Sequence, residues 1–169
     1  MNLDRKIITI VKMALVAAIY VVLTIAIAPL SYMNIQCRIS EIMVLLAFIN
    51  PSYIIGLTLG CFIANTLGPN GLTDIIFGTL ATFLSVSAIA VTGNFIKNKA
   101  RGIFIASLWP TIFNGLIIGT MLHYILNIPL ALSIFQVAIG EFFIVTIIGV
   151  PLFKFFTKKY GKYYDKLSI

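Results

Sequence analysis

The stretch that decides the fold runs from residue 39 to residue 67 and reads ISEIMVLLAFI (39–49), NPS (50–52) and YIIGLTLGCFIANTL (53–67). Each apolar run is shorter than the roughly 20 residues that a helix needs to cross a bilayer. The two runs therefore form either one helix kinked near Pro51 or a tight hairpin of two helices. The choice fixes the number of membrane spans and the side of the membrane on which every later loop lies.

The composition of the chain places most of it in lipid. Of its 169 residues, 60% are hydrophobic and 10% are charged, and the mean hydropathy is +1.08. Soluble domains carry about 25% charged residues and about 45–50% apolar ones. Long apolar runs of this kind cross membranes as helices. The expected fold class is therefore an all-α integral membrane protein, with no extramembrane segment long enough to form a second domain.

Charge decides between the kinked helix and the hairpin. With a hairpin, the N-terminus, the loop at 97–101 and the tail from Lys154 all lie on one side. A single kinked helix would move that loop to the other side, against the excess of Lys and Arg in cytoplasmic segments. In the hairpin arrangement only Arg38 among the 12 cations lies outside. The cations on the cytoplasmic side are Arg5, Lys6, Lys12, Lys97, Lys99, Arg101, Lys154, Lys158, Lys159, Lys162 and Lys166.

The sequence therefore predicts six transmembrane helices in one domain, residues 1–169, with both termini in the cytoplasm of a bacterium. The approximate spans are 7–30, 39–49, 53–67, 73–96, 103–126 and 131–155. The segment from Ser31 to Arg38 is expected to fold back over the protein as a polar lid. The basic tail is expected to lie beside anionic membrane lipid.

Three acidic residues lie in or beside the predicted spans: Glu41, Asp74 and Glu141. A charge at the centre of a helix costs about 2.5–3.5 kcal/mol on insertion scales, so each acid needs a partner or a function. Glu141 lies about 15 Å into its span, near the middle of the bilayer, and Asn114 lies at a similar depth. The other polar residues near the outer ends are Gln36, Arg38, Asn65, His123 and Gln136.

These polar side chains extend from the outer surface to mid-bilayer, whereas the inner half has almost no buried charge. The pattern predicts a pocket that opens to the outside rather than a channel. Three acids against one arginine leave a net charge of about minus two, which favours a substrate with a positive amine or several N–H donors. The candidate substrate-binding residues are Gln36, Arg38, Glu41, Asn65, Asp74, Asn114 and Glu141.

Several of these residues have a purely structural alternative. Arg38 and Glu41, three residues apart on one helical face, are placed to form an ion pair. Asp74 in the first turn of a span complements the helix dipole, and Asn114 is placed for an interhelical hydrogen bond. Glu141 has no such simple explanation and is the strongest candidate for substrate contact.

Motifs for catalysis or for a cofactor are absent from the sequence. It contains no GxxxxGK[ST] phosphate loop, no HExxH pair and no serine elbow. The single histidine, His123, is expected to be structural. Cys37 and Cys61 lack metal or redox spacing and are expected to be packing residues or free thiols. The chain therefore cannot hydrolyse ATP through a phosphate loop, and one histidine is a thin basis for a metal site. We expect no cofactor or metal, and no nucleic-acid partner.

Small residues predict close contacts between helices. Ala14 and Ala18, four residues apart in the first span, allow another helix to approach closely. That helix belongs either to a partner protein docking there or to the same chain. Gly56 and Gly60 form a GxxxG pair in the third span.

Four blocks of the sequence resemble one family of transport proteins. They are Pro29–Tyr32 followed by Ile35–Glu41, Gly60–Asn65 with Leu67–Gly68, Asp74–Thr82, and Gly140–Glu141 ahead of Gly149–Leu152. With the six spans, the polar lid and the alanines of the first span, the chain resembles a substrate-binding S component of an energy-coupling factor (ECF) transporter. More narrowly, it resembles the QueT family of queuosine-precursor transporters.

The resemblance implies a binding subunit without catalytic activity. It would capture a queuosine precursor, namely 7-aminomethyl-7-deazaguanine or a related deazapurine. It would dock through Ala14 and Ala18 on a transmembrane T component driven by two ATPase subunits. Glu41 and Glu141 would divide the guanine-type N–H donors and the aminomethyl cation between them. Arg38 would hold a carboxylate or the purine carbonyl, and the remaining candidates would complete the rim.

Three alternatives stay open at this point. One is an S component for another vitamin or purine. Another is a small intramembrane enzyme that uses Glu41, Glu141 and His123, although the chain offers neither an evident nucleophile nor a second histidine. The third is an assembly subunit without a small-molecule site.

Overall fold

A computed structural model gives the arrangement of residues 3–28, 38–96 and 99–167, with side chains described up to residue 159. Within these ranges the chain forms helices joined by short turns, and no strand occurs. The prediction of an all-α protein is confirmed. Residues 31–37 of the expected lid (Ser31 to Arg38), which include Gln36, lie outside the described residues, as does Lys97.

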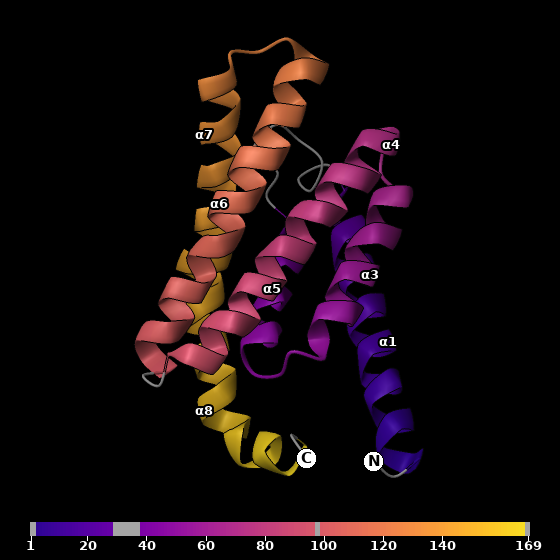
Figure 1. Cartoon of the computed structure of the whole chain (residues 1–169), viewed down its shortest axis with the longest axis vertical. Helices are drawn as coiled ribbons and strands as arrows, with labels where there is room; N and C mark the ends of the chain where they lie inside the picture. The colour runs from indigo at the N-terminus through magenta and orange to yellow at the C-terminus, as the bar shows by residue number, and fades with distance from the viewer. Residues whose placement is uncertain (1–2, 29–37, 97–98, 168–169) are drawn as a thin grey trace.

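Ten consecutive helical segments make up the described chain (Figure 1). They are α1 (Leu3–Ala26), η1 (Ile39–Phe48), α3 (Tyr53–Thr66), α4 (Gly71–Thr73), η2 (Asp74–Gly78), α5 (Thr79–Phe95), α6 (Lys99–Leu126), α7 (Leu130–Glu141), η3 (Phe142–Gly149) and α8 (Val150–Leu167).

Some of these segments run on into one another, so that six helical stretches result. The segments α4, η2 and α5 form one apolar helix from Gly71 to Phe95, and α7, η3 and α8 continue without a break. Four of the six stretches are long and apolar enough to cross a membrane, and η1 and α3 are shorter. The short pair is a hairpin that turns at residues 49–52, not one kinked helix.

Helix boundaries differ modestly from those expected. The fourth stretch begins at Gly71, two residues earlier than predicted, because Gly71 adopts a positive φ of 68° that starts the helix directly after the turn. The last stretch extends past residue 155 as α8. The fifth begins at Lys99 instead of residue 103.

The short η1 run is wound as a 3-10 helix. At about 2.0 Å per residue such a helix is longer than an α-helix with the same number of residues, so ten residues extend about 20 Å instead of about 15 Å. Three residues per turn place Glu41, Val44 and Ala47 on one face, and all three are buried. The winding therefore directs Glu41 into the protein.

Two π-helical stretches adjoin the other two buried acids, Asp74 and Glu141. Asp74 is the first residue of η2, and Glu141 immediately precedes η3. π-Helical turns widen the backbone locally and occur frequently at functional sites. Each of the three buried acids thus lies at or beside a departure from regular α-helix.

Glycines allow close packing between α1 and α3. A Cβ atom added at Gly56 would lie 2.7 Å from the carbonyl oxygen of Met13, and one at Gly60 would lie 2.9 Å from Cβ of Tyr20. Such distances are shorter than van der Waals contact, so only glycine fits. The GxxxG prediction for the third span therefore corresponds to an actual helix contact within the chain.

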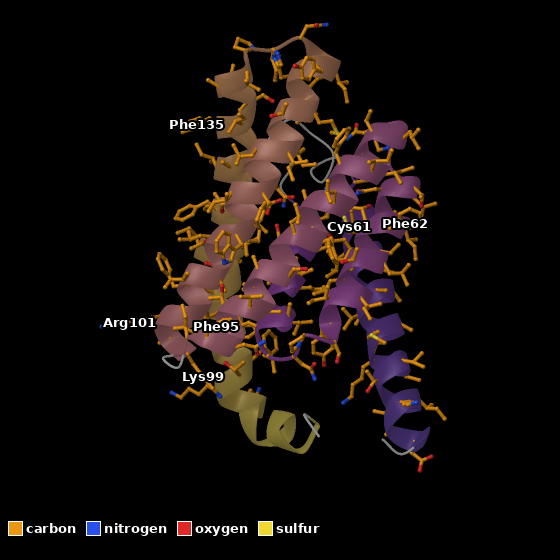
Figure 2. All side chains as sticks on the ribbon, viewed as in Figure 1. Cys61, Phe62, Phe95, Lys99, Arg101 and Phe135 are labelled. Carbon is orange, nitrogen blue, oxygen red and sulfur yellow. The ribbon has the colours of Figure 1, made fainter. Side chains whose placement is uncertain are left out.

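The two ends of the chain lie at the same end of the molecule, near the turn that joins η1 to α3 (Figure 1). The α6–α7 turn and α4 lie at the opposite end. Figure 2 places Lys99 and Arg101 at the end that carries the termini, as the charge argument expected. Phe62, Phe95 and Phe135 point outward and are 44%, 80% and 62% exposed, which suits a surface that faces lipid.

Candidate substrate-binding site

Six of the seven candidate binding residues are buried inside the helical bundle. They are Arg38, Glu41, Asn65, Asp74, Asn114 and Glu141, each exposed by 4% or less. Gln36 lies outside the described residues. Burial of so many polar groups in an apolar protein requires hydrogen-bond or ionic partners, and these partners show how the site is built.

Arg38 forms an ion pair with Asp74. Arg38 Nη2 lies 2.9 Å from Asp74 Oδ2, which joins the start of η1 to the start of η2. Asn70 donates a longer hydrogen bond, 3.4 Å, to the same oxygen. Asp74 therefore has an ionic partner in the interior in addition to its favourable place in a first helical turn.

Asn65 extends the network into α3. Its side-chain Nδ2 donates to the backbone carbonyl of Asp74 at 3.0 Å and lies 3.4 Å from Sγ of Cys61. Gly78 makes this approach possible, because an added Cβ would lie 2.6 Å from Asn65 Nδ2 and 2.9 Å from Asp74 Oδ1. Gly78 is thus part of the site although it contributes no side chain.

Cys61 and Thr82 connect Asn65 to Glu41. Cys61 is a buried free thiol, and its sulfur lies 3.2 Å from the hydroxyl of Thr82. Thr82 in turn donates to Glu41 Oε1 at 3.4 Å. Figure 2 shows Cys61 between the ribbons of α3 and α5. The thiol serves as a packed link in the polar chain, in agreement with its expected structural role.

Glu41 receives a further hydrogen bond from α1. The hydroxyl of Tyr20, which is fully buried, donates to Glu41 Oε1. One oxygen of this carboxylate is thus held by hydroxyl groups from two helices, α1 and α5. Next to it, the hydroxyls of Thr24 and Ser40 pair at 2.7 Å.

Glu141 and Asn114 form the second part of the site. Asn114 Nδ2 donates to Glu141 Oε1 at 2.8 Å, which is the interhelical hydrogen bond considered for Asn114. Glu141 ends α7, and the next segment, η3, packs against η1, which carries Glu41. The two glutamates, which come from opposite halves of the sequence, therefore lie on elements that adjoin in the fold.

Several acceptor oxygens in this region lack a hydrogen-bond donor from the described residues. They are Glu41 Oε2, Glu141 Oε2, Asp74 Oδ1 and Asn65 Oδ1, all buried. An unpaired buried acceptor costs about 1–3 kcal/mol, and more when it is charged. Each of these four oxygens can accept a hydrogen bond from a bound molecule.

His123 takes no part in this network. Its Nδ1 lies 2.6 Å from the carbonyl oxygen of Ile128, so it fastens the turn between α6 and α7. This contact matches the structural role expected for it. Among the described residues, no group of three or more His, Cys, Asp or Glu side chains is arranged to hold a metal ion.

Sequence reasoning missed Tyr20, Thr82 and Gly78. Tyr20 lies inside a long apolar run, where an aromatic residue suggests packing against lipid or core. The sequence did hold one sign of its role: a tyrosine within an apolar helix carries a hydroxyl, and a buried Tyr O–H usually has a hydrogen-bond partner. Nothing local distinguishes Thr82 or Gly78 from other small residues of the same helix.

The face of α1 that carries Ala14 and Ala18 is turned outward. Both alanines are exposed, as are Leu15 and Val22, at 58% and 64%. Contact with α3 uses the other face of the helix, as the glycine contacts of Met13 and Tyr20 show. The two alanines are therefore available at the surface of this chain.

Comparison with known proteins identifies the family. The sequence matches the QueT transporter family over residues 10–158. The chain belongs to the QueT transporter family. This QueT chain is 34% identical over 144 residues to a protein of Lactococcus lactis subsp. cremoris (strain MG1363) described as "Queuosine precursor transporter QueT", covering 79% of the chain and 83% of that relative. No solved structure matches it significantly.

Membership of the QueT family establishes the coarse function. The chain is a membrane transport protein and not an enzyme. The alternative of an intramembrane enzyme that uses Glu41, Glu141 and His123 is therefore set aside, and His123 also has the structural contact described above.

Proposed function

We propose that the chain is the substrate-binding S component of an ECF transporter that imports a queuosine precursor, 7-aminomethyl-7-deazaguanine or a closely related deazapurine. One observation carries the proposal: Glu41 Oε2 and Glu141 Oε2 are buried without a donor from the described residues. The name of the Lactococcus relative, a queuosine precursor transporter, supports the same class of substrate.

The charges of the site favour a cationic, donor-rich ligand. The ion pair of Arg38 with Asp74 is neutral as a unit. Glu41 and Glu141 then remain as two carboxylates without a cation in hydrogen-bond contact among the described partners. A guanine-type edge offers adjacent N–H donors that one carboxylate accepts together, and an aminomethyl cation suits the other. Asn65 Oδ1 is a further acceptor for the ligand.

The remaining candidates complete the site in this proposal. Asn114 orients Glu141 through its 2.8 Å hydrogen bond, and Asp74 with Arg38 forms part of the rim. Gln36, in the segment after α1, is proposed to contact the ligand from the outer side.

The proposed topology follows from the position of charge and of the chain ends. The end of the molecule that carries both termini, Lys99 and Arg101 would face the cytoplasm, in line with the positive-inside rule. The chain would then cross a bacterial plasma membrane six times as a single domain, residues 1–169, with η1 and α3 as its short spans. The exposed face around Ala14 and Ala18 would dock on the T component of an ECF module with two ATPase subunits.

Binding measurements with purified protein test the proposal. We expect 7-aminomethyl-7-deazaguanine to bind more tightly than guanine or queuine in a competition series. Glu41→Gln and Glu141→Gln should each weaken binding about tenfold or more, because each removes the charge of an acceptor that meets the ligand. Asp4→Asn, which removes a carboxylate from the exposed start of α1, is the matched control.

Two outcomes contradict the proposal. Unchanged affinity in both glutamate variants would remove the assignment of the site. Native mass spectrometry that finds a ligand of another class bound to the purified protein would remove the assignment of the substrate.

A further inference from the structure

We infer that Tyr20 is a positioning residue of the binding site, which holds one oxygen of Glu41 so that the other oxygen faces the ligand. The inference rests on the proposed function, since it concerns how that site presents its acceptor. It adds to the site a residue from α1, the helix that the sequence associated only with docking.

The contacts of the Glu41 carboxylate are divided unequally between its two oxygens. Oε1 accepts hydrogen bonds from Tyr20 on α1 and from Thr82 on α5, whereas Oε2 has no donor among the described residues. Glu41 is 1% exposed and Tyr20 is 0% exposed, so bulk water does not replace either contact. Two hydroxyls thus fix the carboxylate from one side and leave the other side for the ligand.

Neutral hydroxyl donors suit this task better than a cation would. A carboxylate has about four acceptor positions on its two oxygens, so two hydroxyl bonds do not exhaust it. Since neither hydroxyl carries a charge, the carboxylate keeps its net negative charge and still attracts a positive or donor-rich ligand. Fixing its rotamer in advance also lowers the entropic cost of binding.

The position of Tyr20 is set by the packing of α1 on α3. A Cβ added at Gly60 would lie only 2.9 Å from Cβ of Tyr20, so α1 and α3 are in close contact at this point. Tyr20 also belongs to the main hydrophobic core. The ring is therefore held by packing, and the hydroxyl can be removed without removing these contacts. This separation makes Tyr20→Phe a test of positioning rather than of folding.

The test measures the affinity of purified full-length protein for 7-aminomethyl-7-deazaguanine by calorimetry. Tyr20→Phe should weaken binding about tenfold, the usual effect of one hydrogen bond to a charged group. The matched control is Tyr124→Phe, because Tyr124 is 76% exposed on α6 and far from the polar network in sequence and contacts. The control should bind like the wild type.

A double-mutant cycle distinguishes positioning from a structural effect. If Tyr20 acts through Glu41, Tyr20→Phe in a Glu41→Gln background should change affinity by no more than about twofold. A loss of the same factor in both backgrounds, or no loss in the single variant, would overturn the inference. If Tyr20→Phe does not fold, Thr82→Val takes its place, with an expected loss of about threefold because its hydrogen bond is longer.

The result for the wild type separates this inference from the proposed function. A wild-type protein that does not bind the deazaguanine amine overturns the proposed function and this inference together. A wild-type protein that binds, with Tyr20→Phe folded and unchanged in affinity, overturns the inference alone.

Discussion

Arg38 Nη2 lies 2.9 Å from Asp74 Oδ2, and the two side chains are 4% and 0% exposed. Arg38 is the only lysine or arginine among the buried side chains of the described residues. Its contact with Asp74 ties η1 to η2. The pair therefore neutralises Asp74, one of the three buried acids of the described residues, and the other two are Glu41 and Glu141.

Replacement of one member of this ion pair should destabilise the folded protein. Arg38→Gln removes the cation that pairs with Asp74, and Asp74→Asn removes the negative charge that pairs with Arg38. Loss of one member of a buried ion pair typically costs about 3–5 kcal/mol. Thermal unfolding in detergent should show a clear fall of the midpoint for each single variant. The double variant should lose less than the sum of the two, because no unpaired charge remains. Additive losses would mean that the two residues act independently.

A methyl group at position 78 should disturb the site. In Gly78→Ala the new Cβ would lie 2.6 Å from Asn65 Nδ2 and 2.9 Å from Asp74 Oδ1, so at least one of these side chains must move. We expect about a tenfold loss of ligand affinity, measured by calorimetry.

The matched control for this variant is Gly115→Ala on α6. There the new Cβ would lie 3.1 Å from Cβ of Ala138, 3.6 Å from its Cα and 3.7 Å from the carbonyl oxygen of Ile134, and none of these atoms belongs to the polar network. Equal affinities for the two alanine variants would contradict a role of Gly78 in the site.

Asn114 should affect ligand binding through its hydrogen bond to Glu141. Asn114→Ala removes the 2.8 Å hydrogen bond to Glu141 Oε1. Since Glu141 Oε2 has no donor among the described residues, both oxygens of the carboxylate would then lack the side-chain donor seen here. Binding should weaken by about tenfold, since hydrogen bonds to charged groups contribute about 1.5–3 kcal/mol. Asn94→Ala, at an exposed position of α5, is the control. An Asn114→Ala protein that binds like the control would reduce Asn114 to a purely structural residue.

The exposed alanines of α1 should affect uptake but not binding. Ala14→Trp combined with Ala18→Trp adds bulk to a face that this chain leaves open. Uptake of the precursor by cells should be abolished, whereas the purified variant should bind the ligand with unchanged affinity. Ala131→Trp, at an exposed position of α7, should leave both properties intact. Lost binding in the α1 variant would indicate that its face packs within the chain.

Much of the architecture could be predicted from the sequence. The hairpin at residues 39–67 followed from the distribution of lysine and arginine, and it is present as η1 and α3. The polar residues singled out for the site are buried wherever the structure describes them. These predictions succeeded because buried charge is costly in an apolar protein, so a polar residue in a span has few places to lie.

Other features could not be predicted in this way. The 3-10 winding of η1 and the π-helical stretches beside Asp74 and Glu141 leave no clear trace in the pattern of apolar residues. An ion pair of Arg38 was considered on its own helical turn, with Glu41, whereas the ion pair that the structure shows is with Asp74, from another helix. Local spacing shows which groups share a face but not which helix that face meets.

The sequence alone determined that this chain is a helical membrane protein with six apolar stretches and a small set of interior polar groups. Those properties depend on hydrophobicity and charge added up along the chain. Tertiary structure decided which polar atoms meet, because the contacts of Arg38 with Asp74, Thr82 with Glu41 and Asn114 with Glu141 join residues 36, 41 and 27 positions apart. Such contacts depend on the rotation and depth of each packed helix, and these are fixed only when all the helices pack together.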